Sequence, residues 1–308
     1  MDLYSTGTII LTGALVAASA GLVGCFLILR RLALLGDAIS HAVLPGIVLA
    51  FLFSGSRSPL AMVLGAGALG IAATFMVQSL QRAGVQEDAS IGVSFTSLFA
   101  LGVVLVSLFA GQVDLDLDCV LYGEIAYTPW QTLTLGGLNL GPRPLWTMGL
   151  IFLLNVGVIG LCYKELKLTA FDPKLAAALG INVTLVHYLL MSLVSVTTVG
   201  AFESVGAILV VAMMIVPAAT AYLLTEKLST MLLLSVVQGL VSSVLGYFLA
   251  RWLDSSIAAA MTSVSGALFA LAFLFAPRAG LVARALAHRQ LSRAEADGRA
   301  GLVPQEAD

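Results

Sequence analysis

An aspartate and a histidine lie four residues apart within a long apolar stretch of this chain. Asp37 and His41 belong to the segment LLGDAISHAVLPG, and no other ionisable side chain occurs between Leu32 and Phe53. On an α-helix, residues four apart lie on the same face, one turn above the other. A charge at the bilayer centre costs roughly 2.5–3.5 kcal/mol on insertion scales, so such residues mark ion pathways or pair with other groups. A carboxylate and an imidazole on one face predict a site for a divalent Mn, Zn or Fe ion.

Two other interpretations of this pair stay open on the residues alone. A neutral, hydrogen-bonded Asp–His pair could simply join two helices, because polar side chains in spans often contribute only to packing. The same groups could relay protons in a secondary cation transporter. Pro45 and Gly46 follow His41 within about one turn, and a proline there disturbs the helix near the imidazole and frees backbone carbonyl oxygens. This irregularity favours a functional site over packing.

The composition is that of a membrane protein with many spans. Of 308 residues, 59% are hydrophobic and 10% charged, against about 25% charged in soluble domains. The pattern predicts an all-α polytopic membrane protein with nine transmembrane helices. Only Phe202 and Glu203 separate the sixth and seventh apolar runs, so eight spans is the alternative count. The nine runs are 7–29, 32–53, 59–80, 90–110, 146–163, 182–201, 204–224, 228–250 and 257–276.

The basic residues predict the orientation. With the N-terminus outside and the C-terminus inside, 12 of the 15 Lys and Arg residues fall in inside segments, and only Arg57, Arg143 and Arg251 fall outside. This distribution follows the positive-inside rule. Residues 1–278 then form the transmembrane domain and 279–308 a cytoplasmic basic and polar tail.

A short helix is predicted in the main internal loop, residues 164–181. In its sequence FDPKLAAALG, Asp172 is a good N-cap, Pro173 fits the first helical position and Gly180 suits the position after the C-terminus. Leu175 and Leu179 share one face. Such a helix could simply join two spans, or it could press into a groove of a cytoplasmic partner.

Three segments, in the same order along the chain, resemble those of one family of transport proteins. They are RRLALLGDAISHAVLPGIVLAFL from Arg30, FDPKLAAALGI from Phe171 and VGAILVVAMMIVPAATA from Val205. With these segments the chain is similar to the metal-ion permeases of bacterial ABC importers, the membrane subunits that take up zinc, manganese or iron. The resemblance covers the first to the ninth predicted span and leaves out the tail.

The resemblance implies a function, a site and partners. Asp37 and His41 become the metal-binding residues of the translocation path, with no permanently bound cofactor. The expected partners are an extracytoplasmic metal-binding protein and a second permease subunit, identical or related, in the bacterial cytoplasmic (inner) membrane, and no nucleic acid. The chain has no GxxxxGK[ST] phosphate loop, so ATP hydrolysis is assigned to a separate ATPase subunit and this chain is not expected to be an enzyme. The implied ATPase-coupling helix comprises Phe171, Asp172, Pro173, Lys174, Leu175, Leu179 and Gly180.

The other ionisable residues are weaker candidates for a functional site, and the other functions are less favoured. His187 is predicted to be a packed or interfacial histidine, and Glu203 a solvated turn residue. The run Asp114, Asp116 and Asp118 alternates with leucine and could steer cations or contact a metal-delivering protein, or form a solvated acidic face. An intramembrane hydrolase is disfavoured because HExxH is absent and no nucleophile lies beside an obvious base. A permease for larger metal chelates shares the broad architecture and stays an alternative.

Overall fold

The structure is a computed structural model that describes residues 3–54, 59–109, 125–135, 138–276 and 280. In parts of two helices, Ala33–Ser54 and Pro59–Arg82, it describes the backbone of several residues but not their side chains. The tail 281–308 and the acidic run Asp114, Asp116 and Asp118 lie outside the described residues, so predictions about them stay as predictions.

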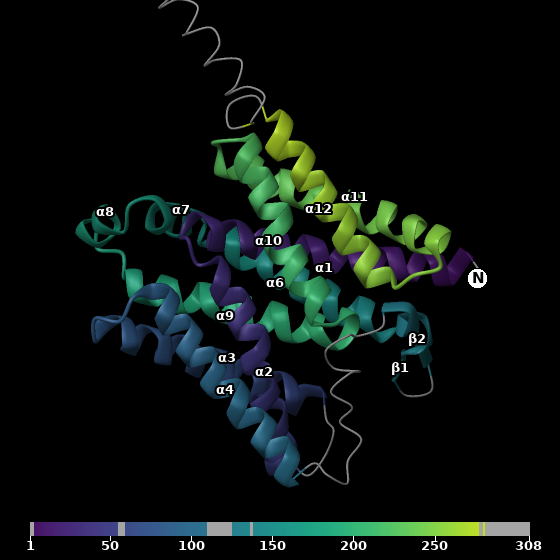
Figure 1. Cartoon of the computed structure of the whole chain (residues 1–308), viewed down its shortest axis with the longest axis horizontal. Coiled ribbons are helices and arrows are strands. Elements are labelled where there is room, and N and C mark those ends of the chain that lie inside the picture. The colour runs from purple at the N-terminus through teal and green to yellow at the C-terminus, as the bar shows by residue number, and fades with distance from the viewer. Residues whose placement is uncertain (1–2, 55–58, 110–124, 136–137, 277–279, 281–308) are drawn as a thin grey trace, which may run out of the picture.

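Long helices make up most of the described chain (Figure 1). Each of the nine predicted apolar runs coincides with one of them. They are α1 (Leu3–Leu29), α2 (Ala33–Ser54), α3 (Pro59–Arg82), α4 (Glu87–Phe109), α6 (Arg143–Leu161), α9 (Val183–Val205), α10 (Ala207–Leu224), α11 (Leu228–Leu253) and α12 (Ile257–Phe275). Among the described residues, seven of these helices are long and apolar enough to cross a membrane, namely α1, α4, α6, α9, α10, α11 and α12.

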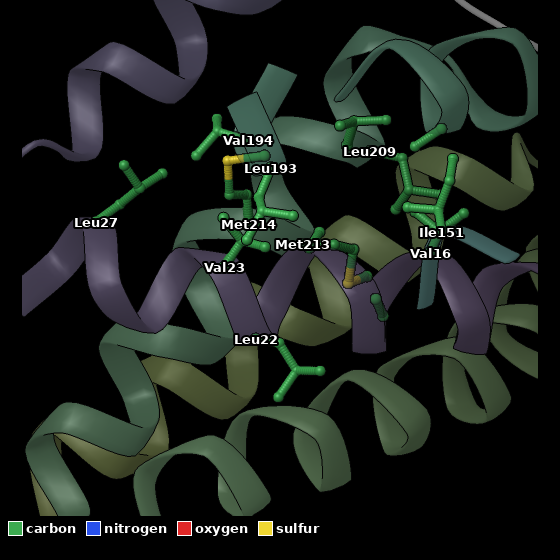
Figure 2. Close-up of a cluster of buried hydrophobic side chains, with 14 of the residues drawn as sticks. Val16, Leu22, Val23, Leu27, Ile151, Leu193, Val194, Leu209, Met213 and Met214 are labelled. Carbon is green, nitrogen blue, oxygen red and sulfur yellow. The ribbon is translucent and has the colours of Figure 1, made fainter. Parts of the chain in front are cut away.

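Helix α1 lies at the centre of the bundle. It packs against α10, α11, α6 and α9, and most of its side chains are buried. Figure 2 shows Val23 of α1 beside Met213 and Met214 of α10, and Val16 of α1 beside Ile151 of α6. Small residues let the helices approach, since a Cβ added at Gly239 of α11 would lie 2.7 Å from the Cβ of Ala17. Helices α2, α3 and α4 pack on one another and join the rest mainly through α9.

The break between the sixth and seventh runs differs from the prediction. The sequence placed it at Phe202 and Glu203, whereas α9 continues to Val205 and the chain turns at Gly206. Gly206 has φ 78° and ψ 166°, a conformation that side chains disfavour, and its N–H donates to the Phe202 carbonyl. A single glycine therefore separates two helices, which is why apolar composition alone misplaced the boundary. Glu203 lies in the last turn of α9 rather than in a turn between helices, and its side chain is not described.

Short elements complete the two ends of the bundle. At one end are the 3₁₀ helix η1 (Ile125–Trp130) and an antiparallel hairpin of β1 (Thr132–Leu135) and β2 (Leu138–Pro142), in which Leu135 pairs with Leu138. At the other end are α7 (Tyr163–Phe171) and α8 (Pro173–Ala178). Figure 1 shows the hairpin near the N-terminal end of α1, with α7 and α8 at the opposite end. The hairpin departs from the purely all-α prediction, because its short strands carry no span-length apolar pattern.

Candidate functional site

Asp37 and His41 lie in the first half of α2. They are the fifth and ninth residues of the helix, about 6 and 12 Å along its axis from the first residue. Their spacing of one helical turn agrees with the prediction. Their side chains lie outside the described residues, so the structure gives their place on the helix and not their contacts.

The backbone around Asp37 is enclosed by other helices. Gly36 and Ala38, on either side of it, are both buried. A Cβ added at Gly36 would lie 2.8 Å from Met214 Sδ of α10 and 3.4 Å from Leu27 Cδ1 of α1. This segment of α2 therefore presses against both α1 and α10. Pro45 and Gly46 farther along α2 are buried too, and the helix continues through Pro45 without a break.

Within the described part of the chain, no group of three or more His, Cys, Asp and Glu side chains could hold a metal ion. His187 in α9 is partly buried, stacks edge-on against Tyr188 with ring centroids 6.0 Å apart, and lines a pocket with Arg30. A neighbouring guanidinium disfavours metal binding by electrostatic repulsion. The placement of His187 therefore agrees with the prediction of a packed histidine.

The predicted short internal helix is present as α8. Asp172 Oδ1 accepts hydrogen bonds from the backbone N–H groups of Lys174 and Leu175, at 3.1 and 2.9 Å. Pro173 occupies the first helical position. These contacts confirm the predicted N-cap and the predicted start of the helix.

The C-terminus of α8 closes in a Schellman motif. The Gly180 N–H donates to the Ala177 carbonyl and the Ile181 N–H to the Ala176 carbonyl, each at 3.0 Å. Gly180 has φ +83°, the left-handed conformation that favours glycine. Both ends of this six-residue helix are therefore held by specific backbone contacts.

Three large apolar side chains are exposed on and beside α8. Phe171, Leu175 and Leu179 are 57%, 48% and 64% exposed, and they follow one another at intervals of four residues. Phe171 also lines an adjacent groove of about 820 Å³, together with Leu29 and the turn between α10 and α11. Exposed apolar residues in register beside a groove are typical of a surface that another protein covers.

Basic residues gather at the end of the bundle that carries α7 and α8. Seven of the nine Lys and Arg residues that the structure describes lie there, and we call this the basic end. They are Arg30, Arg31, Arg82, Lys164, Lys167, Lys174 and Lys227. The opposite end, with the hairpin, has Arg143 and Arg251 among the described residues. The sequence indicated the charge bias, but it did not show that Arg30, Arg82 and Thr169 converge on one pocket.

The apolar helices around α1 and the basic end are those of a multi-pass membrane protein. The chain belongs to the ABC 3 transport family, whose model matches residues 4–276. It is therefore a multi-pass protein of the cytoplasmic membrane. Membership confirms the prediction of a transport subunit rather than an enzyme, with ATP hydrolysis in a separate subunit.

Individual relatives agree with this assignment. The chain is 52% identical over 278 residues to the manganese transport system membrane protein MntD of Bacillus subtilis, covering 90% of this chain and 94% of that protein. It is 45% identical to the zinc transport system membrane protein TroD of Treponema pallidum, covering 93% and 78% of the two chains. Among solved structures, PsaBC from Streptococcus pneumoniae in complex with Fab matches with a TM-score of 0.74 and 33% identity, covering 89% of this chain and 92% of that one.

Proposed function

We propose that this chain is the permease subunit of an ABC importer that carries Mn²⁺ or Zn²⁺ across the cytoplasmic membrane. The observation that carries the proposal is the 52% identity to a manganese transport membrane protein over 90% of the chain. The 45% identity to a zinc transport membrane protein supports the same class of cargo. Carboxylate and imidazole donors suit either ion, and iron stays a prediction from these ligand types.

Asp37 and His41 are the proposed metal ligands of the translocation path. The enclosed backbone of α2 beside Met214 supports this assignment, because an ion bound there would be held within protein and away from lipid. Two donors from one chain hold an ion weakly. A second permease subunit, identical or related, supplies a second pair in this proposal, so the site assembles when the subunits close and releases the ion when they separate.

The proposed orientation has the basic end in the cytoplasm, with nine spans and the N-terminus outside. The seven basic residues at that end, against two at the other, support it through the positive-inside rule. The hairpin end then faces outward, where an extracytoplasmic binding protein delivers the metal. Residues 1–278 are the permease domain and the following residues a cytoplasmic tail.

Helix α8 is the proposed contact with the ATPase. Its two capped ends make it rigid despite its length, and its exposed residues Phe171, Leu175 and Leu179 supply an apolar face. A rigid helix can transmit the closure of the ATPases, because it moves as a unit with α7 and α9, on which it packs. In this proposal ATP binding shifts α8 and thereby switches access to Asp37 and His41.

Uptake by ligand variants tests the metal path. Asp37→Ala and His41→Ala should each abolish ATP-dependent accumulation of radioactive Mn²⁺ or Zn²⁺ in vesicles, while the complex with the ATPase still assembles. Asn155→Ala, which removes a buried polar side chain of α6 instead, is the matched control and should retain uptake. Normal uptake by both ligand variants would overturn the site assignment.

Membership of an ABC family disfavours the alternative of a secondary cation transporter with an Asp–His proton relay. The same vesicles discriminate the two mechanisms. Uptake that follows an imposed pH gradient without ATP would support the proton relay, whereas uptake that requires ATP and persists with a collapsed gradient supports the importer.

A further inference from the structure

A pocket at the basic end is lined by polar and basic residues, most of which have no role in the proposed transport function. Its volume is about 600 Å³, and it opens where the α1–α2 turn, the end of α3, α7 and the start of α9 meet. The polar residues that line it include Arg30, Arg31, Arg82, Gln78, Gln81 and His187. No acidic residue is among the described residues that line it. Three guanidinium groups without a lining carboxylate make this a pocket for an anion.

Arg30 is half-buried and only partly paired. Its Nη2 donates to Thr169 Oγ1 of α7 at 2.6 Å, while its Nε is buried and has no hydrogen-bond partner among the described residues. Burial lowers the pKa of this guanidinium, as expected for a cation taken from water without a compensating charge. An anion in the pocket would supply both the missing charge and the missing acceptor.

Arg31 occupies a backbone position that favours glycine. Its φ is +61°, and the bonds from Arg31 N–H to Ile28 carbonyl and from Leu32 N–H to Leu27 carbonyl close a Schellman motif at the end of α1. Glycine is the usual residue at this position, because a Cβ strains the left-handed conformation. An arginine held there in spite of the strain, with its side chain lining the pocket, indicates a use for that side chain.

The pocket reaches below the ends of the helices. Gln78 lies one turn inside α3 from Arg82, and His187 lies one turn inside α9 from its start, a depth of about 6 Å. Val183 and Thr184, the first residues of α9, also line it, so the positive end of this 23-residue helix faces the pocket. The polar lining therefore extends from the end of the bundle to one turn inside these helices.

We propose that this pocket binds a phosphate group, supplied by the headgroup of an anionic phospholipid. Guanidinium groups bind phosphate oxygens through charge-assisted hydrogen bonds, and basic pockets between membrane helices bind anionic headgroups. The pocket lies at the ends of α1 and α9, both of them long and apolar enough to cross a membrane. Thr169 of α7 and Pro173 of α8 also line it, so the bound lipid steadies the segment that carries α8.

Lipid-dependent thermal stability of the full-length chain tests this proposal. The protein is purified in neutral detergent with phosphatidylcholine and then titrated with phosphatidylglycerol. We expect a saturable rise in melting temperature, with the half-saturating lipid fraction at least tenfold higher in the Arg31→Gln/Arg82→Gln variant. The Lys164→Gln/Lys167→Gln variant removes the same charge from exposed residues of the same end that do not line the pocket, and it should behave as the wild type.

Arg31→Gly separates ligand binding from folding. It relieves the left-handed strain, so it should raise the melting temperature in phosphatidylcholine and yet weaken the response to phosphatidylglycerol. A variant that is more stable and also less responsive to lipid cannot be explained by misfolding. An unchanged response in both Arg31→Gly and the double arginine variant would overturn the proposal.

Two further experiments test whether a phospholipid headgroup is the group that binds in the pocket. If millimolar inorganic phosphate reproduces the stabilisation in phosphatidylcholine while phosphatidylglycerol has no effect, the pocket binds a free anion and the lipid assignment is wrong. The second experiment follows phosphatidylglycerol bound to the chain by native mass spectrometry while the ATPase subunit assembles. If the lipid is released on assembly, an acidic group of the ATPase occupies the pocket and the lipid assignment is also wrong. Retention of the lipid in the assembled complex supports it.

Discussion

Replacing Gly24 by alanine tests how tightly α1 and α10 are packed. A Cβ at Gly24 would lie 1.8 Å from the Met214 carbonyl oxygen and 2.8 Å from the Met214 carbonyl carbon. An ordinary carbon–oxygen contact is about 3.3 Å, so α10 would have to retreat from α1 by about 1.5 Å. Both neighbours are backbone atoms of a helix, which no side-chain rotation can move. The added methyl therefore separates two helices along their contact.

The energetic cost follows from this displacement. Overpacking a close-packed interior costs about 1–3 kcal/mol, and the Gly→Ala change returns about 0.5–1 kcal/mol of helix propensity. The net expectation is a loss of up to about 2.5 kcal/mol. Gly7, near the start of the same helix, has nothing within 4 Å of an added Cβ. Gly7→Ala therefore makes the same chemical change without the clash and should be neutral or slightly stabilising.

The same displacement reaches the proposed metal path. Met214 lies between Gly24 of α1 and Gly36 of α2, where its sulfur is close enough to meet a Cβ on Gly36. Moving Met214 changes the packing of α2 at Gly36, the residue before Asp37. We expect Gly24→Ala to lower the melting temperature of the purified protein by several degrees and to reduce metal uptake more than expression, and Gly7→Ala to do neither. Equal stability and uptake in the two variants would refute the close packing of α1 against α10 at Gly24.

Two other predictions concern polar contacts. Asp172→Ala removes both N-cap hydrogen bonds of α8 and should cost about 1 kcal/mol, which lowers the equilibrium constant for forming the helix about fivefold; Asp172→Asn should keep the cap. Hydrogen exchange at Lys174 and Leu175, with ATP-dependent uptake, measures the effect, and unchanged exchange in Asp172→Ala would contradict it. Asn155→Ala removes the bonds from Asn155 Nδ2 to Thr197 Oγ1 at 2.8 Å and to the Ser19 carbonyl at 3.3 Å and should cost less than about 2 kcal/mol. Thermal unfolding measures this loss, and a collapse of folding would show that Asn155 does more than join α6 to α9 and α1.

Much of the helical architecture could be predicted because it depends on local composition. A helix that crosses a membrane must satisfy its own backbone and present apolar side chains over about 20 residues, and each predicted run became a long helix. The caps of α8 could be predicted for the same reason, because Asp172, Pro173 and Gly180 act on backbone groups within a few residues. The α9–α10 boundary could not be placed, because a turn made by Gly206 alone leaves no polar interval in an apolar stretch.

The sequence by itself determined the helical segments, the short capped helix and the spacing of Asp37 and His41 one helical turn apart, because these follow from spacing along one chain. Only the tertiary structure decided which helices touch. It placed α1 at the centre through contacts as close as Gly24 with Met214, put Met214 beside Gly36, and brought Arg30, Arg82 and Thr169 from three separate segments to one pocket. Side-chain contacts between distant segments depend on how helices pack in three dimensions, and no local pattern in the chain encodes that packing.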